Sequence, residues 1–375
     1  MDGIGRNAKK YSLPLLTAFW FSFLFLPFRG YRAAGILFVT LAVSIPFLTY
    51  VSNRLRKMTP RMERLQNTAR KWGRFSPVLL LPLLAVPFAV DNYWVDVAVL
   101  SGIYVILALG LNVVVGYTGL LNLGFAAFYA IGAYSYALLN TALGLGFWSA
   151  LPLSVGITTV AGFLLAFPAV RLKGDYLAIV TLGFGEIVRL VLNNWDSLTK
   201  GPNGISGIEA PSLFGAKLGD LSSYYYLVLA FVVITVFVMR RVEDSKIGRA
   251  WIAIREDEIA SAAMGISTMR YKLYACAFGA FWAGIAGCLF AAKMRFVSPE
   301  SFTFMESVLI LCMVIIGGIG SITGAITGAV VLVFLPELLR EAQMYRMIAV
   351  GSGLVLLMVF RPQGLFGRKN VSLGS

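Results

Sequence analysis

The stretch "LNVVVGYTGLLNLGFAAF" (residues 111–128) interrupts a long apolar run with small and polar residues. The later stretch "CMVIIGGIGSITGA" (residues 312–325) repeats its pattern, because Val115-Gly116-x-x-Gly119 matches Ile316-Gly317-x-x-Gly320. Glycines let helix backbones approach closely, and broken helices at membrane depth are tolerated where they line a cavity. Tight packing explains any single glycine equally well, but the paired occurrence favours a duplicated core, interrupted at corresponding places. The candidate path residues are Asn112, Gly116, Gly119, Asn122, Gly317 and Gly320.

The composition is that of a polytopic membrane protein. Of the 375 residues only 13% are charged and 58% are hydrophobic, and the mean hydropathy is +0.79. A soluble chain has about 25% charged residues to cover its surface. Lysines and arginines number 32 against 18 acidic residues. In a membrane protein this excess indicates cytoplasmic loops beside anionic lipid rather than nucleic-acid binding.

Several kinds of chemistry lack the residues that they need. The chain has no histidine, which removes the commonest general base and metal ligand. Its three cysteines lie in apolar stretches without CxxC spacing, as small packing residues do. No GxxxxGK(S/T) phosphate loop occurs, so ATP hydrolysis by that route is excluded. We expect a protein that is not an enzyme and has no metal or cofactor.

Apolar runs that approach the length of a membrane-spanning helix, about 17 to 25 residues, recur along the chain. Ten to twelve spanning or partly spanning helices are expected, because the runs at 77–90, 304–317 and 322–336 are short. The predicted fold class is therefore an all-α, polytopic membrane helix bundle. The candidate runs are residues 13–28, 33–51, 77–90, 97–115, 120–139, 147–170, 176–192, 223–239, 273–292, 304–317, 322–336 and 346–360.

The distribution of basic residues tests this map, because lysine and arginine accumulate on the cytoplasmic side. A cytoplasmic N-terminus puts 23 basic residues inside and eight outside, and also places the C-terminus inside. Residues 1–76 then form two anchor helices and a basic loop, since no A-x-A-like cleavage site follows the first run. The main transmembrane domain covers residues 77–366, with a cytoplasmic loop at 240–272, and residues 367–375 form a cytoplasmic tail.

Three charged residues fall within or beside the predicted spans. Glu186 and Arg189 lie three residues apart and share a helical face. Charges inside a membrane are costly and are functional candidates by default. A mutually neutralising pair at a packed interface explains these two residues as well. Glu306 begins a span near the outside, where its side chain is expected to reach water.

The cytoplasmic loop contains "EDEIASAAMG" (residues 256–265). Acidic groups in a first turn, a run of small residues and a closing glycine predict a short surface helix over 256–265. Such a helix is not stable alone in water and is expected to need the groove of a partner. The alternative is a helix that lies on the membrane, which its acidic start disfavours beside anionic lipid.

This segment resembles the coupling loop of ATP-binding-cassette importer permeases, whose pattern is Glu-Ala-Ala-x-x-x-Gly. Glu258, Ala260, Ala262, Ala263 and Gly265 approximate it, with seven rather than six steps from the glutamate to the glycine. Residues 91–366 resemble the LivM-type permease subunits of branched-chain amino acid importers. The resemblance lies in "GLNVVVGYTGLLNLGFAAFYAIGAY" (110–134), "RLKGDYLAIVTLGFGEIVR" (171–189), "GPNGISGI" (201–208), "GRAWIAIREDEIA" (248–260), "FVSPESFTFMES" (296–307) and "RPQGLF" (361–366).

The resemblance implies a type II importer-like bundle in the bacterial inner membrane that carries leucine, isoleucine or valine inward. The implied partners are a sister permease, two cytoplasmic ATPase subunits, a periplasmic substrate-binding protein that meets residues 193–224, and the lipid bilayer. Closure of the ATPases would move residues 256–265 and alternate access through the Gly-broken spans. The residues implied in ATPase coupling are Arg255, Glu256, Asp257, Glu258, Ala260, Ala262 and Gly265.

The sequence leaves other functions open. A sister branch with the same architecture carries urea or short amides, and this chain alone discriminates poorly between the two solutes. An ion-driven secondary transporter would need titratable groups in its path, and only Glu186 and Glu306 qualify. A membrane enzyme is disfavoured by the missing histidine and the lack of clustered acidic residues.

Overall fold

The computed structural model describes residues 83, 84, 87, 88, 90–172, 174–213, 216, 217, 220–338, 351 and 364–366. All of them belong to one unit, Leu80–Ser375. Several predictions fall outside the described residues: the spans at 13–28 and 33–51, most of those at 77–90 and 346–360, the basic loop at 52–77 and the tail at 367–375.

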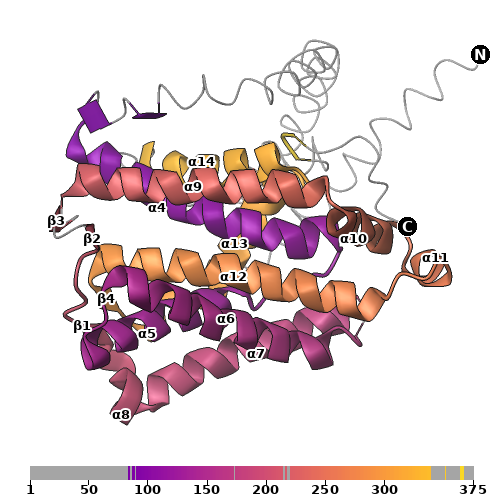
Figure 1. Cartoon of the computed structure of the whole chain (residues 1–375), viewed down its shortest axis with the longest axis horizontal. Coiled ribbons are helices and arrows are strands. Elements are labelled where there is room, and N and C mark those ends of the chain that lie inside the picture. Colours follow the sequence, from indigo (N-terminus) through magenta and orange to yellow (C-terminus); the bar gives the residue numbers. More distant parts are fainter. Residues whose placement is uncertain are drawn as a thin grey trace, which may run out of the picture. The chain divides into compact units, whose positions relative to one another are not determined.

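Helices make up most of the described structure (Figure 1). The α-helices are α4 (Asn92–Leu111), α5 (Phe125–Leu143), α6 (Phe147–Ala169), α7 (Asp175–Asn194), α8 (Asp196–Thr199), α9 (Leu221–Glu243), α10 (Lys246–Glu256), α11 (Glu258–Ala263), α12 (Thr268–Met294), α13 (Phe304–Gly317) and α14 (Ile322–Leu338). The π-helix η1 (Asn112–Tyr117) continues α4, and η2 (Gly201–Asn203) and η3 (Pro299–Phe302) are 3₁₀ turns.

Two short antiparallel ribbons complete this part of the chain. Strand β1 (Ile205–Ser206) pairs with β4 (Phe296–Val297), with Ile205 opposite Val297. Strand β2 (Ser212–Leu213) pairs with β3 (Ala216–Lys217), with Ser212 opposite Lys217. The first ribbon ties the connection after α8 to the connection between α12 and α13.

The helices confirm the predicted membrane bundle. Among the described residues, five helices are long and apolar enough to cross a bilayer: Asn92–Tyr117, Phe147–Ala169, Tyr176–Asn194, Leu221–Glu243 and Thr268–Met294. The short runs predicted at 304–317 and 322–336 are the helices α13 and α14. The run predicted at 120–139 begins later, as α5 at Phe125, because residues 118–124 leave helical geometry.

Helix α12 lies between two groups of helices. It packs on α4, α5 and α6, and Figure 1 shows it between α4, α9 and α14 on one side and α5, α6 and α7 on the other. Small residues allow this close packing. A Cβ atom added to Gly132 of α5 would lie 2.6 Å from the Cα of Gly284 in α12, and one added to Gly162 of α6 would lie 2.3 Å from the Cβ of Ala280.

Connections predicted on the same side of the membrane meet at the same end of the bundle. Residue 255, from the loop predicted inside, contacts both the α4–α5 connection and the α13–α14 connection. At the other end, the indole Nε1 of Trp148 at the start of α6 donates to the carbonyl of Ser212 in β2 over 2.9 Å. Figure 1 shows α10 and α11 at one end and the strands with α8 at the other.

Candidate functional site

The two Gly-rich breaks predicted from the sequence meet at a single junction, where Arg255 of α10 joins them. Its guanidinium Nη1 donates a hydrogen bond to the Gly116 carbonyl in η1. A Cβ atom added to Gly320 would lie 2.9 Å from that Nη1, and one added to Gly119 would lie 3.1 Å from the Cγ of Arg255. Burial lowers the pKa of Arg255 from its ordinary value, and Glu256 opposes the shift. The guanidinium stays charged because arginine is not deprotonated in proteins.

Asn112, which is buried within the bundle, also joins the two breaks. Its Oδ1 accepts a hydrogen bond of 2.9 Å from the Gly320 amide, and the residue is 1% exposed. A Cβ atom added to Gly116 would lie 2.2 Å from that Oδ1 and 2.7 Å from the Gly320 nitrogen. The structure therefore places the candidate path residues Asn112, Gly116 and Gly320 in direct contact, closed to solvent at this point.

The other candidate path residues lie on either side of this junction. Asn122 is 3% exposed, and its Oδ1 accepts 2.9 Å from the Gly124 amide, which turns the chain into α5. Gly317 packs on α14, because an added Cβ would lie 2.0 Å from the Gly324 carbonyl oxygen. Its carbonyl accepts from the Phe366 amide over 2.8 Å, so the "GLF" of residues 364–366 covers the end of α13.

The predicted coupling helix over 256–265 is two elements rather than one. Glu256 ends α10, Asp257 has an extended backbone, and α11 begins at Glu258. The cause is the Asp257 side chain, whose Oδ1 accepts from the Ile259 and Ala260 amides at 2.9 Å each. An aspartate in this position caps a new helix, and so separates α11 from α10.

Helix α11 presents most of its side chains outward. Ile259 is 77% exposed and Met264 is 84% exposed, while Ala260, Ala262 and Ala263 are also exposed. Gly265 ends the segment with φ +85°, and a Cβ atom added there would have no neighbour within 4 Å. No role was predicted for Ile259 and Met264 from the sequence, although two apolar residues beside an alanine run in a charged loop are typical of a contact surface.

The charged side chains of Glu258 and Arg255 both bind other groups of this chain. The Lys272 Nζ lies 2.7 Å from the Glu258 Oε1, and the lysine side chain is only 6% exposed. This ion pair ties the first residue of α11 to the start of α12. Together with the Arg255 contact at the junction, it fixes α11 to the bundle at both of its neighbours, α10 and α12.

The predicted membrane charge pair forms on α7. The Arg189 Nη2 lies 2.8 Å from the Glu186 Oε2, and both side chains are 33% exposed. The two charges neutralise each other on a span where an isolated charge would be costly. Glu306 is partly exposed and accepts a hydrogen bond from the Tyr104 hydroxyl of α4.

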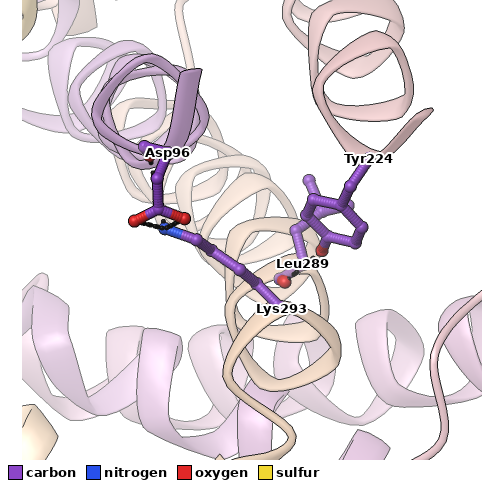
Figure 2. A network of polar contacts seen from close by, with 4 residues as sticks. All are labelled: Asp96, Tyr224, Leu289 and Lys293. Carbon is purple, nitrogen blue, oxygen red and sulfur yellow. Dashed lines mark hydrogen bonds and ion pairs between the residues drawn. The ribbon is translucent and has the colours of Figure 1, made fainter. Parts of the chain in front are cut away.

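A second polar network lies at the end of the bundle opposite α11. Figure 2 shows Lys293 at the end of α12 reaching Asp96 at the start of α4, with 3.1 Å between Nζ and Oδ1. One turn earlier on α12, the Leu289 carbonyl accepts from the Tyr224 hydroxyl of α9. These contacts join α4, α9 and α12 at this end.

An open polar hollow lies at the same end. Its volume is about 1050 Å³, and it is lined by the end of α5 and by the segment that follows α7, including Asp196, Lys200 and Asn203. This segment contains the "GPNGISGI" stretch that was predicted outside. Among the residues that the structure describes, no group of histidine, cysteine, aspartate and glutamate side chains could hold a metal ion.

Comparison with known sequences identifies the family to which the chain belongs. Residues 93–360 match the family described as "Branched-chain amino acid transport system / permease component". The chain belongs to this family. The matched range contains the junction, both Gly-rich breaks, and α10 and α11 of this permease.

Individual relatives agree with the family. The permease is 50% identical over 314 residues to the high-affinity branched-chain amino acid transport system permease protein LivM of Salmonella typhimurium, covering 78% of this chain and 74% of the relative. The LivM protein of Escherichia coli K12 gives the same identity and coverage. The LivH protein of Escherichia coli K12 is 27% identical over 297 residues, covering 72% of this chain and 94% of the relative. No solved structure matches the permease.

Proposed function

We propose that this chain is the LivM-type permease subunit of an ATP-binding-cassette importer that moves leucine, isoleucine and valine into the cell. The observation that carries the proposal is the 50% identity to two LivM permeases, over more than three quarters of this chain. The missing phosphate loop agrees with it, because a transporter of this class takes its energy from separate ATPase subunits.

Helix α11 is the proposed docking site for the ATPases. Its support is geometric: a six-residue helix with exposed Ile259 and alanines, followed by the exposed Met264, is held to the bundle by its flanks. Its outer face contacts nothing else in the described part of the chain. An apolar face of this kind suits a groove in a partner. Of the coupling residues predicted from the sequence, the ones proposed to contact the ATPases are Glu256, Ala260, Ala262 and Gly265, which are exposed. Arg255, Asp257 and Glu258 instead hold α10, α11 and α12 in place.

The proposed orientation puts α11, together with both chain termini, in the cytoplasm. The basic-residue count supports it, and so does the grouping of the predicted inside connections at one end of the bundle. The opposite end, with the hollow beside Asp196 and Lys200, then faces the periplasm and is the proposed contact for the substrate-binding protein.

A sister permease is the proposed neighbour in the membrane. The similarity to both LivM and LivH sequences supports a pair of related permeases. The half-exposed Glu186 and Arg189 pair supports contact through α7, since this face needs a cover other than lipid. A cysteine at Ile187, which is 60% exposed on α7, should cross-link to the sister permease; cross-linking only to lipid-soluble probes would contradict this placement.

The two Gly-rich breaks are the proposed moving part of the path. In the described conformation Asn112 and Gly320 close them against each other. Separation of the breaks would open the bundle near its cytoplasmic end, and glycine backbones with amide side chains suit a zwitterionic solute better than fixed charges do. Unchanged leucine uptake in Asn112→Leu and Asn122→Leu variants would contradict this role.

Leucine uptake by the reconstituted importer tests the function. Vesicles that contain this chain, a sister permease, the ATPases and the binding protein should accumulate radiolabelled leucine only with ATP, and vanadate should stop the accumulation. Excess valine should compete and excess urea should not. Competition by urea in place of valine would favour the urea or short-amide branch. Uptake that survives vanadate but collapses with a protonophore would favour an ion-coupled transporter.

A further inference from the structure

Arg255 stands out because its side chain faces away from the proposed docking surface. It lies two residues before Asp257, the capping residue of α11, and next to Glu256, which ends α10. The guanidinium nevertheless points into the bundle and donates to the Gly116 carbonyl. A charged side chain placed in this way is a poor ATPase contact but a direct link to the two breaks.

The contacts of Arg255 form a continuous chain between parts far apart in the sequence. Its stem packs at Gly119, its guanidinium reaches Gly116, and the Gly320 backbone lies against the same guanidinium. Gly320 in turn donates to Asn112, 208 residues away. Three elements that a moving transporter must coordinate, namely α10, η1 and the break after α13, therefore meet at one side chain.

The link is short and stiff on the α11 side as well. Arg255 is the last residue but one of α10, and a single residue of extended backbone, Asp257, separates α10 from α11. Asp257 fixes the first turn of α11 through two amide hydrogen bonds. The ion pair of Glu258 with the buried Lys272 holds the same turn against α12. These contacts restrict motion of α11 relative to α10, so a displacement of α11 should also displace Arg255.

We propose that Arg255 is a positioning residue that couples α11 to the two Gly-rich breaks, so that displacement of α11 moves η1 and Gly320 together. The proposal rests on the proposed transport function and deepens it. It assigns Arg255 to force transmission inside the permease and not to the ATPase contact. The hydrogen bond to a backbone carbonyl suits this task, since it fixes the position of the main chain at the break.

The test compares Arg255→Gln with the control Arg249→Gln in the full reconstituted importer. Arg249 is on the same helix, is exposed, and donates to the Asp244 carbonyl over 2.7 Å, away from the junction. We expect Arg255→Gln to assemble with its ATPases and to lose leucine uptake by about tenfold or more, within the range usual for coupling between sites. Its ATP hydrolysis should persist but no longer respond to leucine-loaded binding protein, while Arg249→Gln should match the wild type.

Two results would overturn the proposal. Uptake and stimulated ATP hydrolysis within twofold of the wild type would show that the link is dispensable, and loss of bound ATPases would place Arg255 in the docking surface. A wild-type importer that takes up no leucine would count against the proposed function instead, so the two failures are distinguishable.

A second measurement keeps Arg255, so its result does not depend on whether an Arg255 variant folds. Spin labels on Ala262→Cys and Ser321→Cys, in a chain whose three native cysteines are replaced by alanine, report the distance from α11 to the second break. The distance should stay unchanged when vanadate traps the ATPases, because the two sites move as one. A changed distance in the trapped state would contradict the coupling.

Discussion

At the scale of single residues, the junction depends on glycines that admit a neighbouring polar group. Gly116 lies where the Asn112 side chain and the Gly320 amide both approach the helix. Any side chain at this position competes with the hydrogen bond between them. Position 116 therefore requires a residue without a Cβ atom because space is lacking, and not because the backbone angles there favour glycine.

Replacement of Gly116 by alanine measures this requirement. The added Cβ would lie 2.2 Å from the Asn112 Oδ1 and 2.7 Å from the Gly320 nitrogen, so we expect a loss of about 1–3 kcal/mol in stability from overpacking. The matched control is Gly183→Ala in α7, where nothing lies within 4 Å. That variant should be neutral or stabilised by up to about 1 kcal/mol, because alanine favours helix. Thermal unfolding in detergent checks both, and equal effects at the two positions would contradict the close contact at Gly116.

At the scale of elements, the short helix α11 depends on its first capping residue. Six residues are too few to form a helix on propensity alone. Asp257 supplies the two acceptor contacts that satisfy the Ile259 and Ala260 amides. The proposed docking surface therefore exists because one side chain starts it and an ion pair at Glu258 holds it.

Loss of the cap should unfold the docking surface without disturbing the bundle. We expect Asp257→Ala to weaken α11 by about 1 kcal/mol, with faster hydrogen exchange at the Ile259 and Ala260 amides and weaker ATPase binding. Asp257→Ser keeps an acceptor at the cap and should restore most of both properties. Hydrogen exchange with mass spectrometry on the permease follows the first effect. Slow exchange retained in Asp257→Ala would show that partners or lipid, and not the cap, form α11.

The sequence predicted elements well where the governing property is local. Apolar length alone placed the span at 304–317, and α13 occupies Phe304–Gly317. The pairing of the two Gly-rich breaks was also visible as a repeated pattern. The division at Asp257 was missed, because three successive acidic residues were assigned to one first turn although only the middle one caps a helix.

Roles that depend on distant contacts could not be predicted in this way. Asn112 was predicted as a path residue, which stays a prediction; its hydrogen-bond partner Gly320, 208 residues away in the sequence, could not be predicted. Arg255 was assigned to the ATPase surface, because nothing local indicates that its side chain turns back toward Gly116. Such assignments need the tertiary structure, since a side chain's direction is set by what it can pair with.

At the scale of the whole molecule, the described unit has two chemically different ends joined by a small-residue core. One end carries the Arg255 junction and α11, and the other carries the Asp96–Lys293 pair and the polar hollow. Gly- and Ala-mediated contacts along α12 connect them through the bundle. This arrangement suits a protein that receives energy at one membrane face and solute at the other.

The most direct test is the labelling of Met264→Cys by a membrane-impermeant thiol reagent, in a chain otherwise free of cysteine. Met264 is 84% exposed beside α11, so its cysteine is accessible unless a partner covers it. The cysteine should react in inside-out vesicles, should not react in intact cells, and should be protected when the ATPase subunits are bound. Reaction from the external face, or full reaction in the presence of bound ATPases, would contradict a cytoplasmic coupling surface on α11.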